Sequence, residues 1–145
     1  MSVFEKKITL PYTPHQLYTL VNDITAYPHF VPYCLQGQVL EEQPTYVVAS
    51  LTLGSMGIQT SLTTHNTLYP DESIHMQLVK GPLRHLEGVW SFKEAPQGSF
   101  VTLHIDYILS DTFIDVLAGP LVEKVIHSMC DVFIQEAGRR YDTKL

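Results

Sequence analysis

The chain has 145 residues, a length that is typical of one domain and sufficient to bury a hydrophobic core. Its hydrophobic fraction is 45% and its charged fraction 17%, a balance that excludes an intrinsically disordered chain. The formal net charge of −6 excludes generic affinity for nucleic acid phosphates, so DNA is not an expected partner.

The first third of the chain predicts a strand, a helix and a short apolar segment. Residues 3–10 are β-branched at several positions and end before a proline, as a strand would. Thr13 and Pro14 suit the N-cap and first position of a helix, and apolar residues at helical spacing extend it to about Ile24. Two prolines within residues 27–34 then exclude a long regular element, so a short helical turn or loop is expected there.

Six further segments have the length of strands and are separated by turn signals. Each turn contains proline or glycine, and their nearly regular spacing is typical of an antiparallel meander. Apolar and polar residues alternate, as Trp90 and Phe92 do against Glu87 and Ser91, so one face of the sheet should be dry and the other wet. The expected strands are residues 36–42, 45–53, 58–68, 73–80, 84–92 and 99–109.

The longest predicted element is a C-terminal helix. Apolar residues recur at three- and four-residue steps from about Phe113 to Tyr141, with charged residues on the opposite face. Asp111–Thr112 is expected to cap this helix, and Gly119–Pro120 to bend or briefly break it. The predicted fold is a single α+β domain over residues 1–145, in which a curved antiparallel sheet of about seven strands wraps around the long helix.

A cleft between the sheet and the helix is the expected binding site, because one helix cannot fill the concave face of a strongly curved sheet. Its walls are the dry faces of both elements, which suit a hydrophobic small molecule; each buried methylene contributes about 0.8 kcal/mol. The same residues would form an ordinary core if the cleft were filled. The predicted lining residues are Val48, Met76, Leu78, Leu86, Trp90, Leu103, Ile105, Leu117, Leu121, Val125 and Met129.

The apolar segment at residues 27–33 is expected to lie over this cleft, because an apolar loop must pack down or meet something apolar outside the protein. Two roles stay open, a lid on the cleft and a gate that dips into a membrane, where tyrosine suits the interfacial region. The predicted gate residues are Tyr27, Phe30, Val31 and Tyr33.

The sequence predicts no catalytic centre, no metal site and no cofactor. Glu87, His104 and Asp106 could supply acid/base groups, but strand alternation assigns all three to the wet face, whereas catalytic carboxylates belong in the cleft. No nucleophile elbow, phosphate loop or metal motif is present. Cys34 and Cys130 lack metal-ligand spacing and are expected as buried thiols in a reducing compartment.

The expected cellular location and the basic residues are compatible with a partner that binds the protein surface. No signal peptide and no run long enough to span a bilayer is recognisable, so we expect a cytoplasmic protein, with peripheral contact to the inner membrane left open. Lys80, Arg84 and Arg139–Arg140 could meet lipid headgroups or ribosomal RNA. Basic residues in the last turn of a helix also complement its dipole, which is the alternative interpretation.

Two stretches resemble one protein family. Residues 18–34, YTLVNDITAYPHFVPYC, are similar to the signature Y-x-L-V-x-D-x-x-x-Y-P-x-F-[LV]-P-x-C of the coenzyme Q-binding and RatA proteins. Residues 81–92, GPLRHLEGVWSF, are similar to that family's G-P-F-x-x-L-x-G-x-W-x-F. The chain departs from the family at Leu83, where Phe is usual, and at Tyr33, where mitochondrial members often have Trp; neither change threatens the fold. The resemblance runs through essentially the whole chain.

This family belongs to the START-like (polyketide cyclase-like, SRPBCC) superfamily, which implies a helix-grip fold with a hydrophobic tunnel. Eukaryotic relatives bind ubiquinone and support respiration, some bacterial relatives are ribosome association toxins, and older descriptions call the same proteins oligoketide cyclases or dehydrases. We therefore expect binding and delivery of ubiquinone or another polyisoprenoid lipid in support of respiratory electron transport. The alternatives are a RatA-type toxin that binds a ribosomal subunit and inhibits subunit association, and, less favoured, an oligoketide cyclase or dehydrase.

Overall fold

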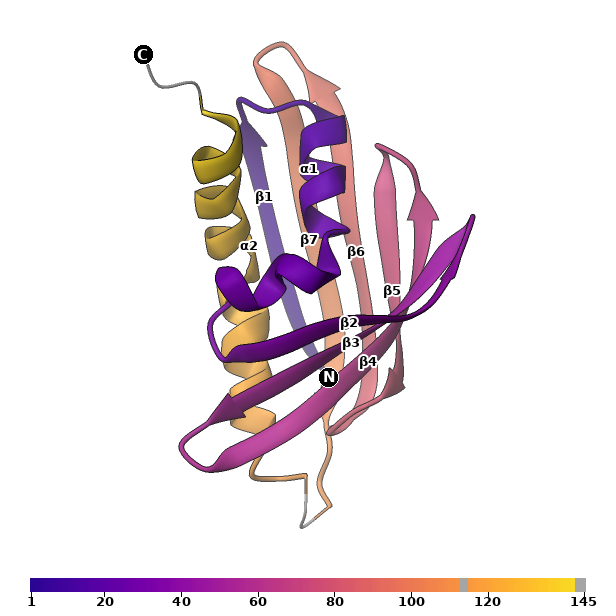
Figure 1. Cartoon of the computed structure of the whole chain (residues 1–145), viewed down its shortest axis with the longest axis vertical. Helices are drawn as coiled ribbons and strands as arrows, with labels where there is room; N and C mark the ends of the chain where they lie inside the picture. Colours follow the sequence, from indigo (N-terminus) through magenta and orange to yellow (C-terminus); the bar gives the residue numbers. More distant parts are fainter. Residues whose placement is uncertain (113–114, 143–145) are drawn as a thin grey trace.

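The computed structural model describes residues 1–112 and 115–142. Within them lie seven strands, two α-helices and one 3₁₀-helix, in the order β1, α1, η1, β2 to β7, α2 (Figure 1). The strands are β1 (Ser2–Leu10), β2 (Cys34–Gln43), β3 (Tyr46–Ser55), β4 (Ile58–Tyr69), β5 (Ser73–Lys80), β6 (Leu83–Ala95) and β7 (Gly98–Leu109). The helices are α1 (Pro14–Val21), η1 (Ile24–His29) and α2 (Gly119–Tyr141). None of the described helices is long and apolar enough to cross a membrane.

The seven strands form one antiparallel sheet in the order β1-β7-β6-β5-β4-β3-β2. The chain starts at one edge, crosses to the other edge through α1 and η1, and then returns strand by strand until β7 pairs with β1. Buried and more exposed residues alternate along β3 and β7, as expected for a sheet with one dry face. The predicted α+β fold, a curved antiparallel sheet around a C-terminal helix, is confirmed.

Local sequence explains where α1 begins and ends. The Thr13 side chain accepts the Gln16 N–H at 3.1 Å, and the Gln16 side chain accepts the Thr13 N–H at 2.9 Å, which is a capping box. Helix α1 ends at Val21, earlier than the sequence predicts, and Ile24 begins the tighter turns of η1. Pro28 lies inside η1, where a regular α-helix could not continue.

Helix α2 begins later than the sequence predicts. The expected start at Phe113 falls on residues 113–114, which lie outside the described part of the chain. Residues 115–118 form a turn, in which the N–H groups of Ala118 and Gly119 both donate to the Asp115 carbonyl oxygen. Pro120 then lies in the first turn of α2, where its missing N–H costs no intrahelical bond. The expected bend or brief break at Gly119–Pro120 is therefore the start of α2, and residues 115–118, predicted as helix, are a turn.

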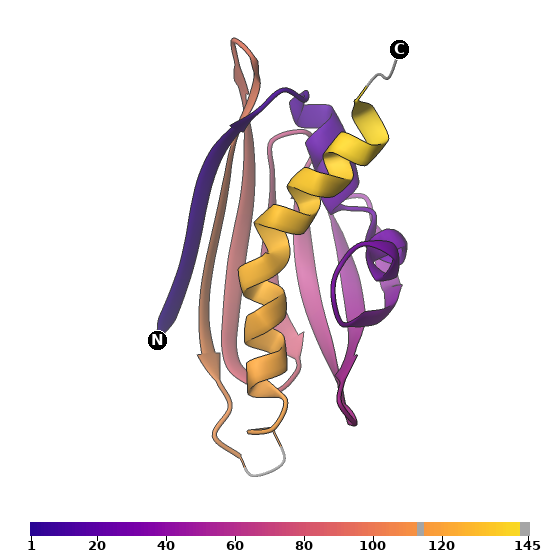
Figure 2. The same ribbon diagram turned by 90° about the vertical axis from the view of Figure 1, so that its left-hand side faces the viewer.

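Helix α2 crosses one face of the sheet, and its C-terminal end lies beside α1 (Figure 2). The Tyr141 hydroxyl donates to the Gln16 carbonyl oxygen at 3.0 Å. Helix η1 lies against β2, where a Cβ on Gly37 would come within 2.1 Å of the Ile24 carbonyl oxygen. Glycine at this position allows the two backbones to approach so closely. The sheet, α2 and η1 therefore face a common interior.

Candidate functional site

A cavity of about 60 Å³ lies between the sheet and α2. Its wall comes from the inward faces of β3 to β7, from η1 and from α2. This volume is well below the roughly 300–1,000 Å³ of small-molecule sites, so a large ligand needs side chains to move aside. Unbranched thioethers at two positions in the wall suit such movement. The lining residues are Ile24, Tyr27, Ala49, Leu51, Leu53, Leu62, Thr64, Asn66, Met76, Leu86, Trp90, Ile105, Val122, Val125, Ile126 and Met129.

The structure brings six of the eleven predicted lining residues to this cavity. They come from three strands and from α2, as the dry-face argument requires. Tyr27, a predicted gate residue, also lies in the wall. That these residues bind a ligand stays a prediction. The six are Met76, Leu86, Trp90, Ile105, Val125 and Met129.

The other five predicted lining residues do not border the cavity. Leu103 and Leu121 are buried in the surrounding core, and Leu78 is half-buried at its margin. Val48 lies on the other face of β3, since its neighbours Val47 and Ala49 are the ones that point inward. Leu117 is 62% exposed, because it belongs to the turn before α2 and not to the helix.

Nine lining residues were not predicted. Most are apolar residues of β3, β4 and α2 whose inward orientation follows from strand parity or helix phase once the register is known. Two of them, Thr64 and Asn66, are polar. They share the inward face of β4 with Leu62, and the Thr64 hydroxyl donates to Asn66 Oδ1 at 2.8 Å. The detectable signal is that Thr64 and Asn66 occupy even-numbered positions of β4, on the same face as Ile58, Leu62 and Leu68.

A row of paired residues across the sheet contains a glycine, and the space above this glycine is filled by a flexible side chain. Across the sheet, Asn66 pairs with Met76, Met76 with Gly88, and Gly88 with Ile105. A Cβ on Gly88 would come within 2.7 Å of Met76 Cε. The flexible end of Met76 therefore occupies the space that the absent side chain of Gly88 leaves open.

The predicted gate segment packs down over the interior. Tyr27 and Val31 are buried, and the Tyr27 hydroxyl donates to the Val21 carbonyl oxygen. Phe133 of α2 lies between Tyr27 and Phe30, with ring centroids 5.2 Å from each. Burial raises the pKa of Tyr27 far above its usual range, so the phenol stays neutral. We call residues 27–33 the lid.

Tyr33 is one of three exposed residues of the lid, with His29 and Pro32. Tyr33 is 39% exposed and has a φ of 65°, a left-handed conformation that is uncommon outside glycine and asparagine. The ammonium group of Lys124 lies 5.9 Å from the centroid of its ring. The tip of the lid therefore presents an aromatic ring next to a basic residue on the protein surface.

A cluster of charges joins α2 to the lid. Glu136 is buried, and its carboxylate accepts hydrogen bonds from Arg139 at 2.6 and 2.8 Å and from Arg140 at 2.8 Å. Arg140 also lies 3.1 Å from Asp23 and 5.8 Å from the centroid of the Phe30 ring. The hydrogen bonds from Arg139 and Arg140 lower the pKa of Glu136 to about 2 despite its burial. These two arginines are balanced by Glu136 and Asp23.

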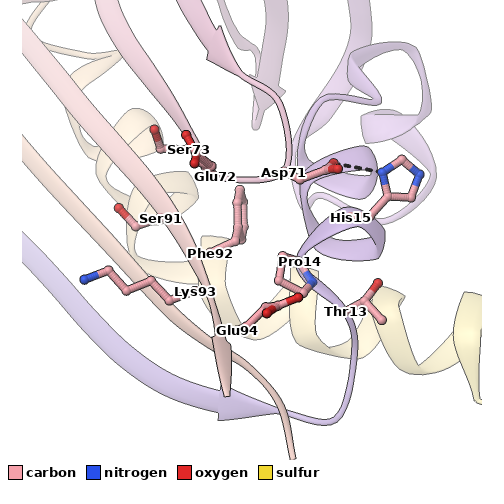
Figure 3. A pocket seen from close by; sticks show the side chains of 10 residues that line it. All are labelled: Thr13, Pro14, His15, Asp71, Glu72, Ser73, Ser91, Phe92, Lys93 and Glu94. Atoms are coloured by element: carbon pink, nitrogen blue, oxygen red, sulfur yellow. Dashed lines mark hydrogen bonds and ion pairs between the residues drawn. The ribbon is translucent and has the colours of Figure 1, made fainter. Parts of the chain in front are cut away.

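A larger hollow of about 630 Å³ lies on the outside, next to the start of α1 (Figure 3). It is lined by Asp71, Glu72 and Glu94 together with His15 and Lys93. His15 and Asp71 form an ion pair with 2.8 Å between Nδ1 and Oδ1, and both side chains are largely exposed. This hollow is therefore a charged surface groove, unlike the apolar cavity between the sheet and α2.

The acid/base candidates lie on the outer face of the sheet. Glu87 is exposed, and His104 bonds Glu5 at 2.9 Å and Asp106 at 3.1 Å in a surface cluster. The hydrogen bond to Glu5 raises the pKa of His104 above its usual value. As predicted, none of the three lines the cavity. Among the described residues, no group of three metal-ligating side chains gathers in one place.

The two thiols are buried, as predicted. Burial raises the pKa of Cys130 to about 11 and also raises the pKa of Cys34. Both are therefore protonated and poorly reactive near neutral pH.

Comparison with known proteins gives the family. The family model described as polyketide cyclase / dehydrase and lipid transport matches residues 10–134. The chain belongs to this family. Ribosome association toxin RatA of Pseudomonas aeruginosa is 36% identical over 138 residues, which are 94% of this chain and 96% of that protein. Coenzyme Q-binding protein COQ10 homolog B, mitochondrial, of Xenopus laevis is 28% identical over 142 residues, which are 94% of this chain and 58% of that protein.

Solved structures of this superfamily have the same architecture. Zhui aromatase/cyclase from Streptomyces sp. R1128 gives a TM-score of 0.80 at 20% identity and covers 98% of this chain and 96% of its own. A START superfamily protein from Mycobacterium smegmatis gives a TM-score of 0.72 at 16% identity, with 94% and 97% covered. At these identities the likeness shows the fold alone. The expected START-like helix-grip fold and the resemblance to the coenzyme Q-binding and RatA proteins are confirmed.

Proposed function

We propose that this family member binds ubiquinone or a similar polyisoprenoid lipid and delivers it in support of respiratory electron transport. The observation that carries the proposal is the cavity itself, whose wall of sixteen residues holds no charged side chain and is closed by the lid. Membership in a family described by lipid transport agrees with it, as does the similarity to a coenzyme Q-binding protein.

Binding in this proposal requires the walls to separate. A benzoquinone ring with even one isoprenoid unit is larger than the present cavity of about 60 Å³. Movement of the lid and of Met76 and Met129 makes the necessary room. Each methylene that then leaves water contributes about 0.8 kcal/mol, so a dozen buried carbons support micromolar binding after the cost of association.

Association with the ribosome is the second candidate, supported by the names of the RatA relatives. The arrangement of basic residues favours it less. Arg139 and Arg140 are paired with Glu136 and Asp23, and Arg84 lies 3.9 Å from Asp111. Contact of these three arginines with ribosomal RNA would first have to break their pairs.

Cyclisation or dehydration is the least supported function. Catalysis of that kind needs an acid or base in contact with the substrate, and the cavity wall contains no carboxylate and no histidine.

Lipid extraction tests the proposal. The protein is purified from its host without detergent, extracted with organic solvent and examined by mass spectrometry for quinones. We expect near-stoichiometric quinone in the wild type and a sharp loss in Val125→Glu, which places a charge in the wall. Val79→Glu, at a 58% exposed position on β5, is the matched control and should keep its quinone.

A second variant protects the test against misfolding of Val125→Glu. Ala49→Leu fills the cavity from β3 without adding a charge and should also lose quinone. Quinone retained in a folded Ala49→Leu protein would contradict this location of the site. If no lipid is found, a ribosome profile with added protein becomes the deciding experiment, and a defect in subunit joining would favour the second candidate.

A further inference from the structure

Asn66 is a buried amide with an unused donor. It is 4% exposed, and it carries the one amide among the described residues that line the cavity. Its Oδ1 accepts the Thr64 hydroxyl at 2.8 Å, and in this arrangement the amide is held with Nδ2 on the other side. Within residues 1–112 and 115–142, no hydrogen bond joins its Nδ2 to a protein atom, and this nitrogen is not among the fully buried unpaired atoms, so it keeps some accessible surface.

Such a residue is unfavourable in a purely structural wall. Buried polar groups in proteins almost always have hydrogen-bond partners, and leaving a donor unpaired destabilises the fold. The residues that pair with Asn66 on the neighbouring strands are Val47 and Met76, both apolar. Leucine is close to asparagine in size and would suit these surroundings better. The amide therefore has a use that core packing does not supply.

We propose that Asn66, oriented by Thr64, donates a hydrogen bond from Nδ2 to a carbonyl oxygen of the bound ligand, so that the site selects a carbonyl-bearing head group over a pure hydrocarbon. This inference rests on the function proposed above and adds its head-group specificity. A site built around a donor rejects ligands that leave the donor unpaired, which gives much stronger selection than a change in apolar size.

The surroundings of Asn66 restrict the ligand further. The cavity wall contains no Lys, Arg or His, so a carboxylate would be buried without a counter-ion and is disfavoured. A neutral carbonyl, as in a quinone or an ester, meets no such cost. Room for the head group lies beside Asn66, where the Met76 methyl now covers Gly88 and can swing away.

The test compares two ligands that differ in the carbonyl oxygens. The first is a 2,3-dimethoxy-5-methyl-1,4-benzoquinone with a decyl tail, and the second is decylbenzene. Affinities for the full chain are measured by titration calorimetry. For the quinone, quenching of Trp90, the single tryptophan of the sequence and a residue of the cavity wall, gives an independent value.

Asn66→Leu should weaken the quinone about ten-fold or more, in keeping with the loss of one buried hydrogen bond. It should leave decylbenzene unchanged or bound more tightly. The melting temperature should stay the same or rise, because the variant removes an unpaired donor. Equal weakening of both ligands, unchanged quinone affinity, or a marked fall in melting temperature would each show that Asn66 is structural and overturn the inference.

Thr64→Val is the second variant, and it removes only the hydroxyl that orients the amide. A smaller loss, about three-fold and confined to the quinone, is expected. Thr63→Val is its matched control, since the Thr63 hydroxyl bonds Ser50 on the neighbouring strand and does not line the cavity. It should change neither affinity, and an equal loss in both threonine variants would contradict the orienting role.

The wild-type protein separates this inference from the proposed function. Binding of decylbenzene without preference for the quinone would keep an apolar site and overturn the role of Asn66. Binding of neither ligand would remove the proposed function and the inference together. Methyl laurate, with an ester carbonyl, distinguishes an acyl ester from a quinone, and whichever carbonyl ligand binds should lose affinity in Asn66→Leu.

Discussion

Arg140 of α2 lies 3.1 Å from Asp23, the residue that precedes η1, measured from guanidinium nitrogen to carboxylate oxygen. The same guanidinium also donates to the buried Glu136 and lies over the Phe30 ring. One side chain therefore joins the last turns of α2 to both ends of η1. Since Phe133 of α2 also packs against Tyr27 and Phe30, this contact adds to the packing of α2 against η1.

Removal of this contact should speed ligand exchange. In Arg140→Gln, α2 loses its ion pair to Asp23, its contact with the Phe30 ring of the lid and a hydrogen bond to Glu136, and we expect quinone release to be roughly ten-fold faster. Stopped-flow recovery of Trp90 fluorescence measures the rate. Arg139→Gln is the control, because Arg139 also bonds Glu136 but is 70% exposed and makes no contact with Asp23. Equal acceleration in both variants would point to Glu136 and not to the lid.

The stability of the protein should depend on Glu136 in a defined pH range. Its pKa is about 2 in the folded protein against an ordinary value of 4.5, so its ion pairs stabilise the fold above about pH 5 and are lost as the pH falls toward 2. Glu136→Gln should lower the free energy of unfolding by about 3 kcal/mol near neutral pH, and the difference from wild type should shrink between about pH 5 and pH 2.

Urea unfolding at a series of pH values checks the Glu136 prediction. Glu42→Gln, at an exposed position of β2, is the control and should follow the wild type throughout. A difference between wild type and Glu136→Gln that does not change with pH would mean that packing of the side chain, and not its charge, is responsible.

Gly37 should be essential for the close packing of η1 against β2. A Cβ there would lie 2.1 Å from the Ile24 carbonyl oxygen, so Gly37→Ala must push η1 away from β2. We expect a loss of about 2 kcal/mol in the free energy of unfolding, as for overpacking of a core. In the control Gly54→Ala, on the neighbouring strand, the new methyl meets only the movable end of Leu35, and the loss should be clearly smaller. Similar losses in both would argue against close contact of η1 and β2.

Tyr33 tests whether the lid meets a membrane. Tyr33→Asn removes the exposed ring, and asparagine tolerates the left-handed φ of 65° well, so the melting temperature should not fall. If the ring inserts at the lipid interface, co-sedimentation with anionic vesicles should drop several-fold. The equally simple change Tyr69→Asn, at a tyrosine that is 45% exposed at the end of β4, should have no effect. Unchanged sedimentation of Tyr33→Asn would leave the lid without a role at the membrane.

The strands and the fold could be predicted because glycines and prolines mark nearly every turn. The orientation of individual side chains was harder where the pattern is uniformly apolar. In β3, Val47 and Val48 are both suitable for a dry face, and only pairing with β4 shows that Val47 points inward. The start of α2 was missed for a similar reason, since the apolar spacing of the sequence continues up to Gly119 although residues 115–118 form a turn.

Polar residues in the cavity escaped prediction for a different reason. Apolar residues were sought for an apolar site, so Thr64 and Asn66 were assigned no role although they occupy inward positions of β4. The buried amide becomes visible only when the register shows its partners Val47 and Met76. A polar residue that falls on the dry side of an amphipathic strand is thus the pattern worth searching for in related sequences.

The small size of the cavity affects both the ligand-free state and the affinity for a ligand. At about 60 Å³ the walls of the cavity are nearly in contact. The ligand-free protein therefore exposes little apolar surface inside the cavity, and exposed apolar surface is what promotes aggregation. Reopening the walls costs free energy, and that cost is subtracted from the affinity for each new molecule. For the proposed delivery of a lipid, such weakened binding favours release.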